Sequence, residues 1–156
     1  MRILLVHKSV VESHEYMRAA VERCVAFNNA YEGKANGEIL ALELTGSFYA
    51  DAPQNLLYIG IDENAKICAS GFATLANYFG TRVVDCDQLW RDSKAAKFEP
   101  GQLEQVLKSI IKWGQLHGAK VMRTYAINEK VAEIAEGYGW KRSPQILLEM
   151  DISSEE

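Results

Sequence analysis

The chain has 156 residues, of which 48% are hydrophobic and 24% are charged, and a formal net charge of -4. This length and balance predict one globular domain over residues 1–152, followed by an acidic tail at residues 153–156. The negative charge disfavours sequence-independent binding of nucleic acid, which rests on neutralising phosphates. It mildly favours a partner that carries an amine.

Other features of the composition bear on where the chain works. Its three cysteines are too few and too scattered for a disulfide framework or a zinc knuckle, so a reducing compartment, the cytoplasm, is expected. The apolar run at residues 3–6 is too short for a signal sequence or a membrane span, and it predicts a strand. The three histidines lack metal-ligand spacing, so we expect no metal site. We also expect no membrane partner.

Two helices are predicted after this first strand. Ser9 and Glu12 have the spacing of a capping box, which predicts that a helix starts there. Apolar residues at helical spacing then form one stripe: Met17, Ala20, Val21, Cys24 and Val25. Residues 38–44 favour a helix by composition, although their leucines also alternate as in a strand.

The middle of the chain predicts strands. Residues 56–61 and 66–75 predict a β-hairpin, and a second turn leads into a strand at residues 82–90. Strict alternation in that strand puts Asp85 and Asp87 on one face. These two acids are either catalytic groups or ordinary carboxylates that are solvated or paired with lysine or arginine.

Residues 102–152 are the most informative part of the chain. An amphipathic helix is followed by a strand at residues 119–125, a short helix that begins at Asn128 and ends in glycines, and an alternating strand at residues 145–152. A strand, a helix and a strand in one sheet nearly always form a right-handed parallel crossover. The strands at residues 82–90 and 119–125 are therefore expected to be parallel.

The order of these elements, and the segment around the short helix, resembles the GCN5-related N-acetyltransferase (GNAT) superfamily. That family commonly has an asparagine, a short helix and Gly-Phe here, and Asn128, Ile134, Gly139 and Trp140 take the corresponding places. The resemblance implies an α/β fold with a mixed, mostly antiparallel sheet, in which a β-meander precedes a parallel βαβ crossover and helices cover both faces. It also implies transfer of an acetyl or other acyl group to an amine of a small molecule or protein.

By the same resemblance, acetyl-CoA or another acyl-CoA is the cofactor. Backbone groups at the end of the preceding strand would hold its pantetheine arm, and the start of the long helix would hold its pyrophosphate. The cofactor-binding residues that the resemblance implies are Leu89, Arg91, Lys94, Lys97, Gly101, Gln102 and Asn128. Asp85 and Asp87 are the catalytic candidates, of which one would take the proton of the amine.

Two positions depart from the pattern of the family. Its pyrophosphate loop is rich in glycine, whereas residues 91–101 contain Gly101 alone, and Lys94 and Lys97 would bind phosphate by charge instead. Ala135 stands where the family often has a tyrosine that acts as general acid.

The run from Asp87 to Arg91 also resembles GNAT-like proteins of bacteriophages, some of which are virion or accessory proteins. A second interpretation is therefore a catalytically degenerate GNAT-fold protein with a structural or interaction role. Patterns in a single sequence do not separate a dimer face from a core face, so a homodimer stays open.

Overall fold

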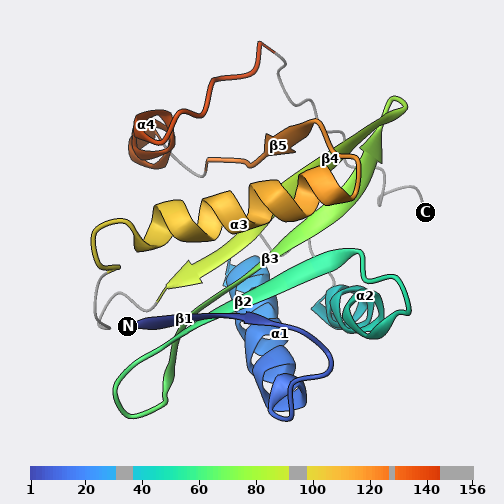
Figure 1. The fold of residues 1–156 in the computed structure, drawn as a ribbon, viewed down its shortest axis with the longest axis vertical. Helices are drawn as coiled ribbons and strands as arrows, with labels where there is room; N and C mark the ends of the chain where they lie inside the picture. The colour runs from blue at the N-terminus through green and yellow to red at the C-terminus, as the bar shows by residue number, and fades with distance from the viewer. Residues whose placement is uncertain (31–36, 92–97, 127–128, 145–156) are drawn as a thin grey trace, which may run out of the picture. The chain divides into compact units, whose positions relative to one another are not determined.

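The computed structural model describes residues 1–30, 37–91, 98–126 and 129–144. These belong to two compact units, Met1–Thr124 and Tyr125–Glu156. The described elements of the first unit are β1 (Arg2–Val6), α1 (Ser13–Ala30), α2 (Gly37–Tyr49), β2 (Asn55–Ile61), β3 (Ile67–Tyr78), β4 (Thr81–Arg91), α3 (Gln102–Leu116) and β5 (Val121–Arg123) (Figure 1). The single domain over residues 1–152 stays a prediction.

The described residues form a five-stranded sheet in the order β1-β2-β3-β4-β5. The first four strands are antiparallel to their neighbours, and β5 is parallel to β4, with α3 making the crossover. The predicted meander and the predicted parallel crossover are both confirmed. β5 is shorter than the strand predicted at residues 119–125, since it covers only Val121–Arg123.

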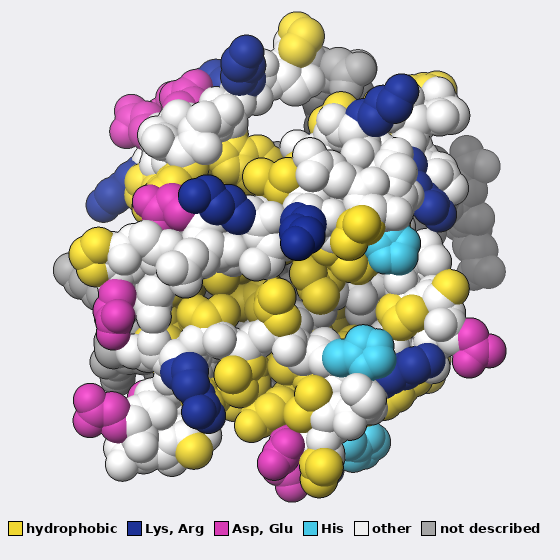
Figure 2. Space-filling view, in the orientation of Figure 1, with side chains coloured by type: hydrophobic (Ala, Val, Ile, Leu, Met, Phe, Trp, Pro, Cys, Tyr) yellow, Lys and Arg dark blue, Asp and Glu magenta, His cyan; other side chains and the backbone are white. Residues whose placement is uncertain are grey.

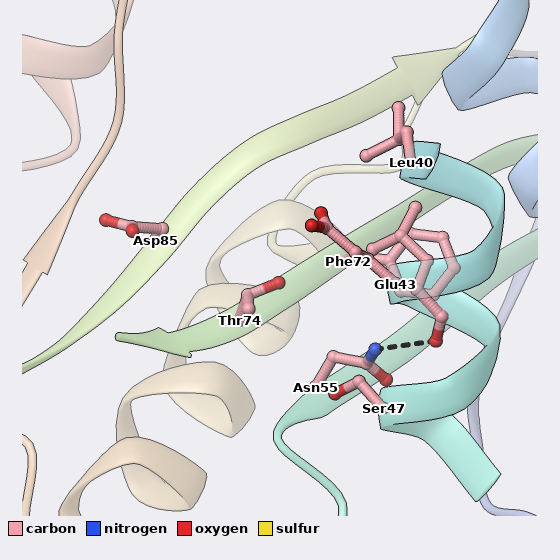
Figure 3. Close-up of a pocket in the computed structure, with 8 residues that line it drawn as sticks. Leu40, Glu43, Ser47, Asn55, Phe72, Thr74 and Asp85 are labelled. Atoms are coloured by element: carbon pink, nitrogen blue, oxygen red, sulfur yellow. Dashed lines mark hydrogen bonds between the residues drawn. The ribbon is translucent and has the colours of Figure 1, made fainter. Parts of the chain in front are cut away.

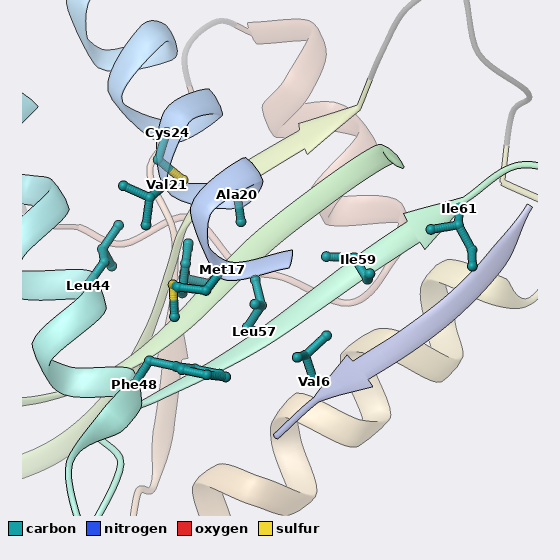
Figure 4. Close-up of a cluster of buried hydrophobic side chains, with 11 residues drawn as sticks. Val6, Met17, Ala20, Val21, Cys24, Leu44, Phe48, Leu57, Ile59 and Ile61 are labelled. Atoms are coloured by element: carbon teal, nitrogen blue, oxygen red, sulfur yellow. The ribbon is translucent and has the colours of Figure 1, made fainter. Parts of the chain in front are cut away.

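The main core lies between one face of the sheet and helices α1 and α2 (Figure 4). The predicted apolar stripe of α1 is confirmed, and the helix predicted at residues 38–44 forms and continues to Tyr49. The buried residues of this core are Val6, Met17, Ala20, Val21, Cys24, Leu44, Phe48, Leu57, Ile59, Ile61 and Phe72. We call this side of the sheet the α1/α2 face.

The start of α1 corrects the prediction of a capping box. The helix begins at Ser13, four residues after the predicted cap. The amide of Ser9 donates to Nδ1 of His7 at 3.2 Å, and the Ser9 hydroxyl lies 2.9 Å from the same nitrogen. The Ser13 hydroxyl instead donates to the carbonyl of Lys8 at 3.2 Å. Ser9 thus binds the His7 ring locally and does not cap the helix.

The opposite face of the sheet packs against α3. Val106 and Ile110 of α3 are buried, and a Cβ built on Gly114 would lie 2.6 Å from Cγ2 of Val84. The glycine therefore allows the helix to approach β4 closely. Two apolar side chains on this side stay partly exposed: Leu5 of β1 at 46% and Ile111 of α3 at 41%. Figure 2 shows hydrophobic side chains at the surface beside α3.

The second unit contains the short helix α4 (Glu129–Gly137), which confirms the prediction of a helix there. Gly139 adopts a φ of 87°, and the amide of Trp140 donates to the carbonyl of Ala135 at 3.2 Å, so the helix ends in the predicted glycine turn. Asn128, the predicted strand at residues 145–152 and the acidic tail lie outside the described residues. No helix in the described ranges is both long and apolar enough to span a bilayer.

The contact between α3 and β4 makes a prediction about stability. Gly114→Ala should lower the free energy of unfolding by about 1–3 kcal/mol, because the added methyl overlaps Val84. Gly46→Ala on α2 is the control: its Cβ would meet no atom within 4 Å, so it should be neutral or stabilising by up to about 1 kcal/mol. Urea unfolding of both variants checks this, and equal effects at the two sites would contradict it.

Burial of the cysteines makes a second prediction. Burial raises the pKa of the Cys24 thiol from 9.0 to about 12. The unfolded chain therefore ionises this thiol at a pH where the folded chain keeps it protonated. The contribution of this thiol to the free energy of unfolding is fully present below pH 9.0. Above that pH it falls, by roughly 1.4 kcal/mol per pH unit at most.

Unfolding of the wild type and of Cys24→Ala on both sides of pH 9.0 measures this effect. The variant should be less stable throughout but should show the shallower decline at alkaline pH. Parallel declines in the two proteins would show that Cys24 does not contribute.

Candidate functional site

A row of polar residues crosses the sheet from β2 to β5. Asn55 is paired in register with Thr74, Thr74 with Asp85, and Asp85 with Arg123. Residues directly opposite one another in neighbouring strands lie on the same face. Phe72, two residues before Thr74, belongs to the core under α1 and α2, so this polar row lies on the α1/α2 face.

An irregularity in β4 begins immediately after the polar row. Thr74 of β3 is opposite Asp85, and Phe72 is opposite Gln88, so β4 advances three residues while β3 advances two. An extra residue of this kind is a β-bulge, which interrupts alternation. The prediction that Asp85 and Asp87 share a face assumed strict alternation, and that assumption is wrong. The side chain of Asp87 lies outside those that the structure describes.

Asp85 forms an ion pair with Arg123. Nε of Arg123 donates to Oδ1 of Asp85, and Nη2 donates to Oδ2 at 3.1 Å. The guanidinium also lies 4.7 Å from the centre of the Tyr78 ring. The side chains of Asp85 and Arg123 are only 20% and 31% exposed, so the ion pair is partly shielded from water. The sequence left Asp85 as either a catalytic group or a carboxylate paired with lysine or arginine. The structure shows the pairing with arginine.

A groove of about 280 Å³ lies beside the polar row, between α2 and the sheet (Figure 3). It is lined by Leu40, Glu43, Leu44, Ser47, Asn55, Phe72, Thr74 and Asp85. Figure 3 shows the Asp85 carboxylate turned away from α2, in keeping with its bond to Arg123 on β5. Four of the polar lining residues therefore face the groove from α2, β2 and β3: Glu43, Ser47, Asn55 and Thr74.

Asn55 leaves a hydrogen-bond acceptor unused in the groove. Its side chain is almost fully buried, at 3% exposure, and Nδ2 donates to the carbonyl of Leu44 at 3.0 Å. That bond assigns the other amide atom as oxygen, and within the described chain Oδ1 has no hydrogen-bond partner. The buried hydroxyl of Ser47 likewise has none there. Unsatisfied buried polar groups are rare, so these two atoms make this wall a candidate for binding a ligand or water.

The pairing of β4 with β5 ends directly after the polar row. β5 ends at Arg123, and Thr124 still reaches β4 through its hydroxyl, which donates to the carbonyl of Cys86 at 3.0 Å. β4 continues to Arg91, and from Cys86 onward its described pairing is with β3 alone. The predicted cofactor residues Leu89 and Arg91 lie on this stretch of backbone, opposite Gly71 and Ala69.

The start of α3 carries two more of the predicted cofactor residues. Gly101 has a φ of 83° and supplies no side-chain cap to the helix. The side chain of Gln102 turns away from the first turn: Oε1 accepts from the amide of Glu99 at 2.9 Å, and Nε2 donates to the carbonyl of Met1 at 2.6 Å. No side chain caps this helix end, but the Gln102 amide donates to the carbonyl of Glu99 at 3.0 Å. Glu104 in the first turn also offsets part of the positive helix end. Lys94 and Lys97 lie outside the described residues.

Sequence analysis missed most of the groove. Glu43 and Ser47 stand four residues apart on α2, a spacing that puts them on one side of a helix, but it gave no reason to pair them with a strand. Asn55, Thr74 and Arg123 come together only through strand register, for which a single sequence carries no signal.

Structural comparison relates this fold to acetyltransferases. A protein from Clostridium acetobutylicum described as a predicted acetyltransferase, solved with acetyl-CoA, matches with a TM-score of 0.70 over 97% of this chain and 96% of that one, at 11% identity. The aminoglycoside acetyltransferase AAC(6')-Iy, in complex with the bisubstrate analogue CoA-S-monomethyl-acetylneamine, matches at 0.63 over 96% and 97%, also at 11% identity. An aminoglycoside acetyltransferase from an uncultured soil sample matches at 0.62 over 97% and 98%, at 13% identity.

These likenesses show the fold of the chain. It is the GNAT acyltransferase fold, with the meander, the parallel crossover and helices on both faces, as the sequence resemblance implied. No family model and no curated protein sequence matches the chain.

The ion pair in the polar row gives the third prediction. A double-mutant cycle with Asp85→Asn and Arg123→Gln should measure a coupling of about 1–2 kcal/mol, because the pair is bidentate and partly shielded. The control is Arg18 and Glu22 on α1, which are 4.0 Å apart and 73% and 71% exposed. Their coupling should be about 0.3–0.5 kcal/mol. Equal couplings would remove the argument that the Asp85 carboxylate is held in place.

Proposed function

We propose that the chain is an acyl-CoA-dependent N-acyltransferase that acylates the amine of an acceptor bound in the groove beside α2. The observation that carries this proposal is the end of the described β4–β5 pairing at Asp85 and Arg123, beyond which β4 continues to Arg91. A donor bound along this stretch of β4 would meet an acceptor in the groove at Asp85. The acetyl-CoA and CoA-analogue complexes of proteins with this fold support the same donor.

The residues present fit such a donor. The β4 backbone near Leu89 and Arg91 would hold its pantetheine arm, and the first turn of α3 after Gly101 and Gln102, which no side chain caps, would hold its pyrophosphate. When bound, the cofactor supplies the acyl group as a thioester. Lys94 and Lys97 would offset the charge of Glu104 near the pyrophosphate, and Asn128 completes the set implied by the resemblance.

Three acidic residues are candidates for roles in deprotonating or binding the amine. Asp85 would take the proton of the bound amine, directly or through water, while Arg123 keeps the carboxylate in place. Asp87 is the alternative base, and Glu43 adds a second carboxylate on the groove. The acceptor amine, once neutral, is the nucleophile.

One observation favours a second candidate function. Both oxygens of Asp85 are bound by Arg123, an arrangement that a purely structural residue would also have. A non-catalytic GNAT-fold protein with a structural or interaction role, of the kind that the bacteriophage resemblance implies, would keep this pair for stability. Such a protein would copurify with an assembly and would not depend on the charge of Asp85.

Calorimetric titration with acetyl-CoA and CoA tests the donor. We expect binding with a Kd below about 1 mM, because the start of α3 has no side-chain cap and would favour an anion. Absence of binding at millimolar ligand would remove the acyltransferase proposal and leave the fold untouched.

Asp85→Asn tests the base in an assay for acyl transfer to amines. Loss of a general base should lower kcat by about 10²–10⁴-fold with CoA affinity unchanged. Glu22→Gln, in the exposed pair on α1, is the matched control and should keep full activity. Activity of Asp85→Asn equal to the wild type would move the role to Asp87 or favour the non-catalytic alternative.

A further inference from the structure

We infer that the groove selects a small amine that carries a second hydrogen-bond donor, and that Asn55 recognises this donor. The inference rests on the proposed function, because it assigns the acceptor of the same site. It starts from one atom, Oδ1 of Asn55, which is buried and without a partner in the described chain. The bond from Nδ2 to the Leu44 carbonyl fixes the amide, so Asn55 offers the groove an acceptor and no donor.

The other polar groups of the groove also favour a ligand that donates. Glu43 has a carboxylate with no ion pair among the described residues, whereas the charge of Asp85 is balanced by Arg123. The hydroxyls of Ser47 and Thr74 both donate and accept. The groove therefore has a surplus of acceptors and one uncompensated negative charge, which together suit an ammonium group.

The apolar lining sets the rest of the ligand. Leu40, Leu44 and Phe72 form a surface for a short hydrocarbon body. Asn55 and Asp85 are two strands apart in one row, which separates their backbones by roughly 9–10 Å. A volume of about 280 Å³ lies near the lower end of the range for small-molecule sites. These dimensions suit a short aliphatic chain with an amine at one end and a hydroxyl or second amine at the other.

Two probes of equal charge test the inference without any CoA. Aminopentanol and pentylamine share a five-carbon chain and an ammonium group, and they differ in the terminal hydroxyl. The full chain should bind aminopentanol about fivefold more tightly, because its hydroxyl satisfies Oδ1 of Asn55. Titration followed by ¹H–¹⁵N NMR should show saturable shifts of the Asn55 side-chain amide with aminopentanol and much smaller ones with pentylamine.

Variants assign the effect to the groove. Asn55→Leu should abolish the preference for aminopentanol, and Ser47→Ala, which removes a hydroxyl without breaking a described hydrogen bond, should reduce it. Ser70→Ala is the matched control, since this hydroxyl is also buried and unpartnered in the described chain but lies outside the groove lining. The control should keep the preference. If Asn55→Leu does not fold, the wild-type NMR titration decides alone.

Equal affinity for the two probes, or shifts that leave the Asn55 amide unchanged, would overturn the inference. Its failure is distinguishable from failure of the proposed function. A chain that binds CoA but does not discriminate between the probes keeps the acyltransferase proposal and loses this one. A chain that discriminates but does not bind CoA keeps the groove and loses the donor.

Discussion

Strand register is the constraint on which the candidate site depends. Asn55, Thr74, Asp85 and Arg123 come from four strands, and they form one row only because each is directly opposite the next. A slip of one residue in any pair would move its side chain to the other face of the sheet. The core under α1 and α2 prevents such a slip, since it would expose Leu57 or Phe72. Burial of apolar residues therefore holds the polar row in place.

The bulge in β4 acts at the end of this row. It adds one residue after Asp85, just where β5 ends and the described pairing of β4 continues with β3 only. Bulges bend a strand and raise its local twist, and they are frequent beside active sites. The ion pair of Asp85 with Arg123 joins β4 to β5 at their last paired position, and the Thr124 hydroxyl adds one more link at Cys86. These contacts fix the point at which the pairing of β4 with β5 ends.

Features that depend on local periodicity could be predicted from the sequence. The stripe of α1, the strands of the meander and the glycine end of α4 all follow from spacing within one segment. Features that depend on competition between neighbours could not. The His7 ring took the serine of the expected cap, and the bulge broke the alternation assumed for Asp85 and Asp87. Asn55 was not predicted as a site residue, because its place in the groove depends on contacts with residues distant in sequence. It bonds to the Leu44 carbonyl and is opposite Thr74 on the next strand.

The glycine-poor loop before α3 changes how a pyrophosphate would be bound more than whether it is bound. Glycines in such a loop let the backbone approach the phosphates closely. The helix amides contribute separately through their orientation, and at α3 they lack a side-chain cap because Gly101 has no side chain and Gln102 binds Glu99 and Met1. Glu104 weakens the positive end of the helix, so lysines in the preceding loop would have to supply the difference. Because charge is screened by salt whereas a close backbone cradle is less so, donor affinity in this chain should depend on ionic strength more steeply than in a protein with the glycine-rich loop. Titration with CoA at two salt concentrations would measure that dependence.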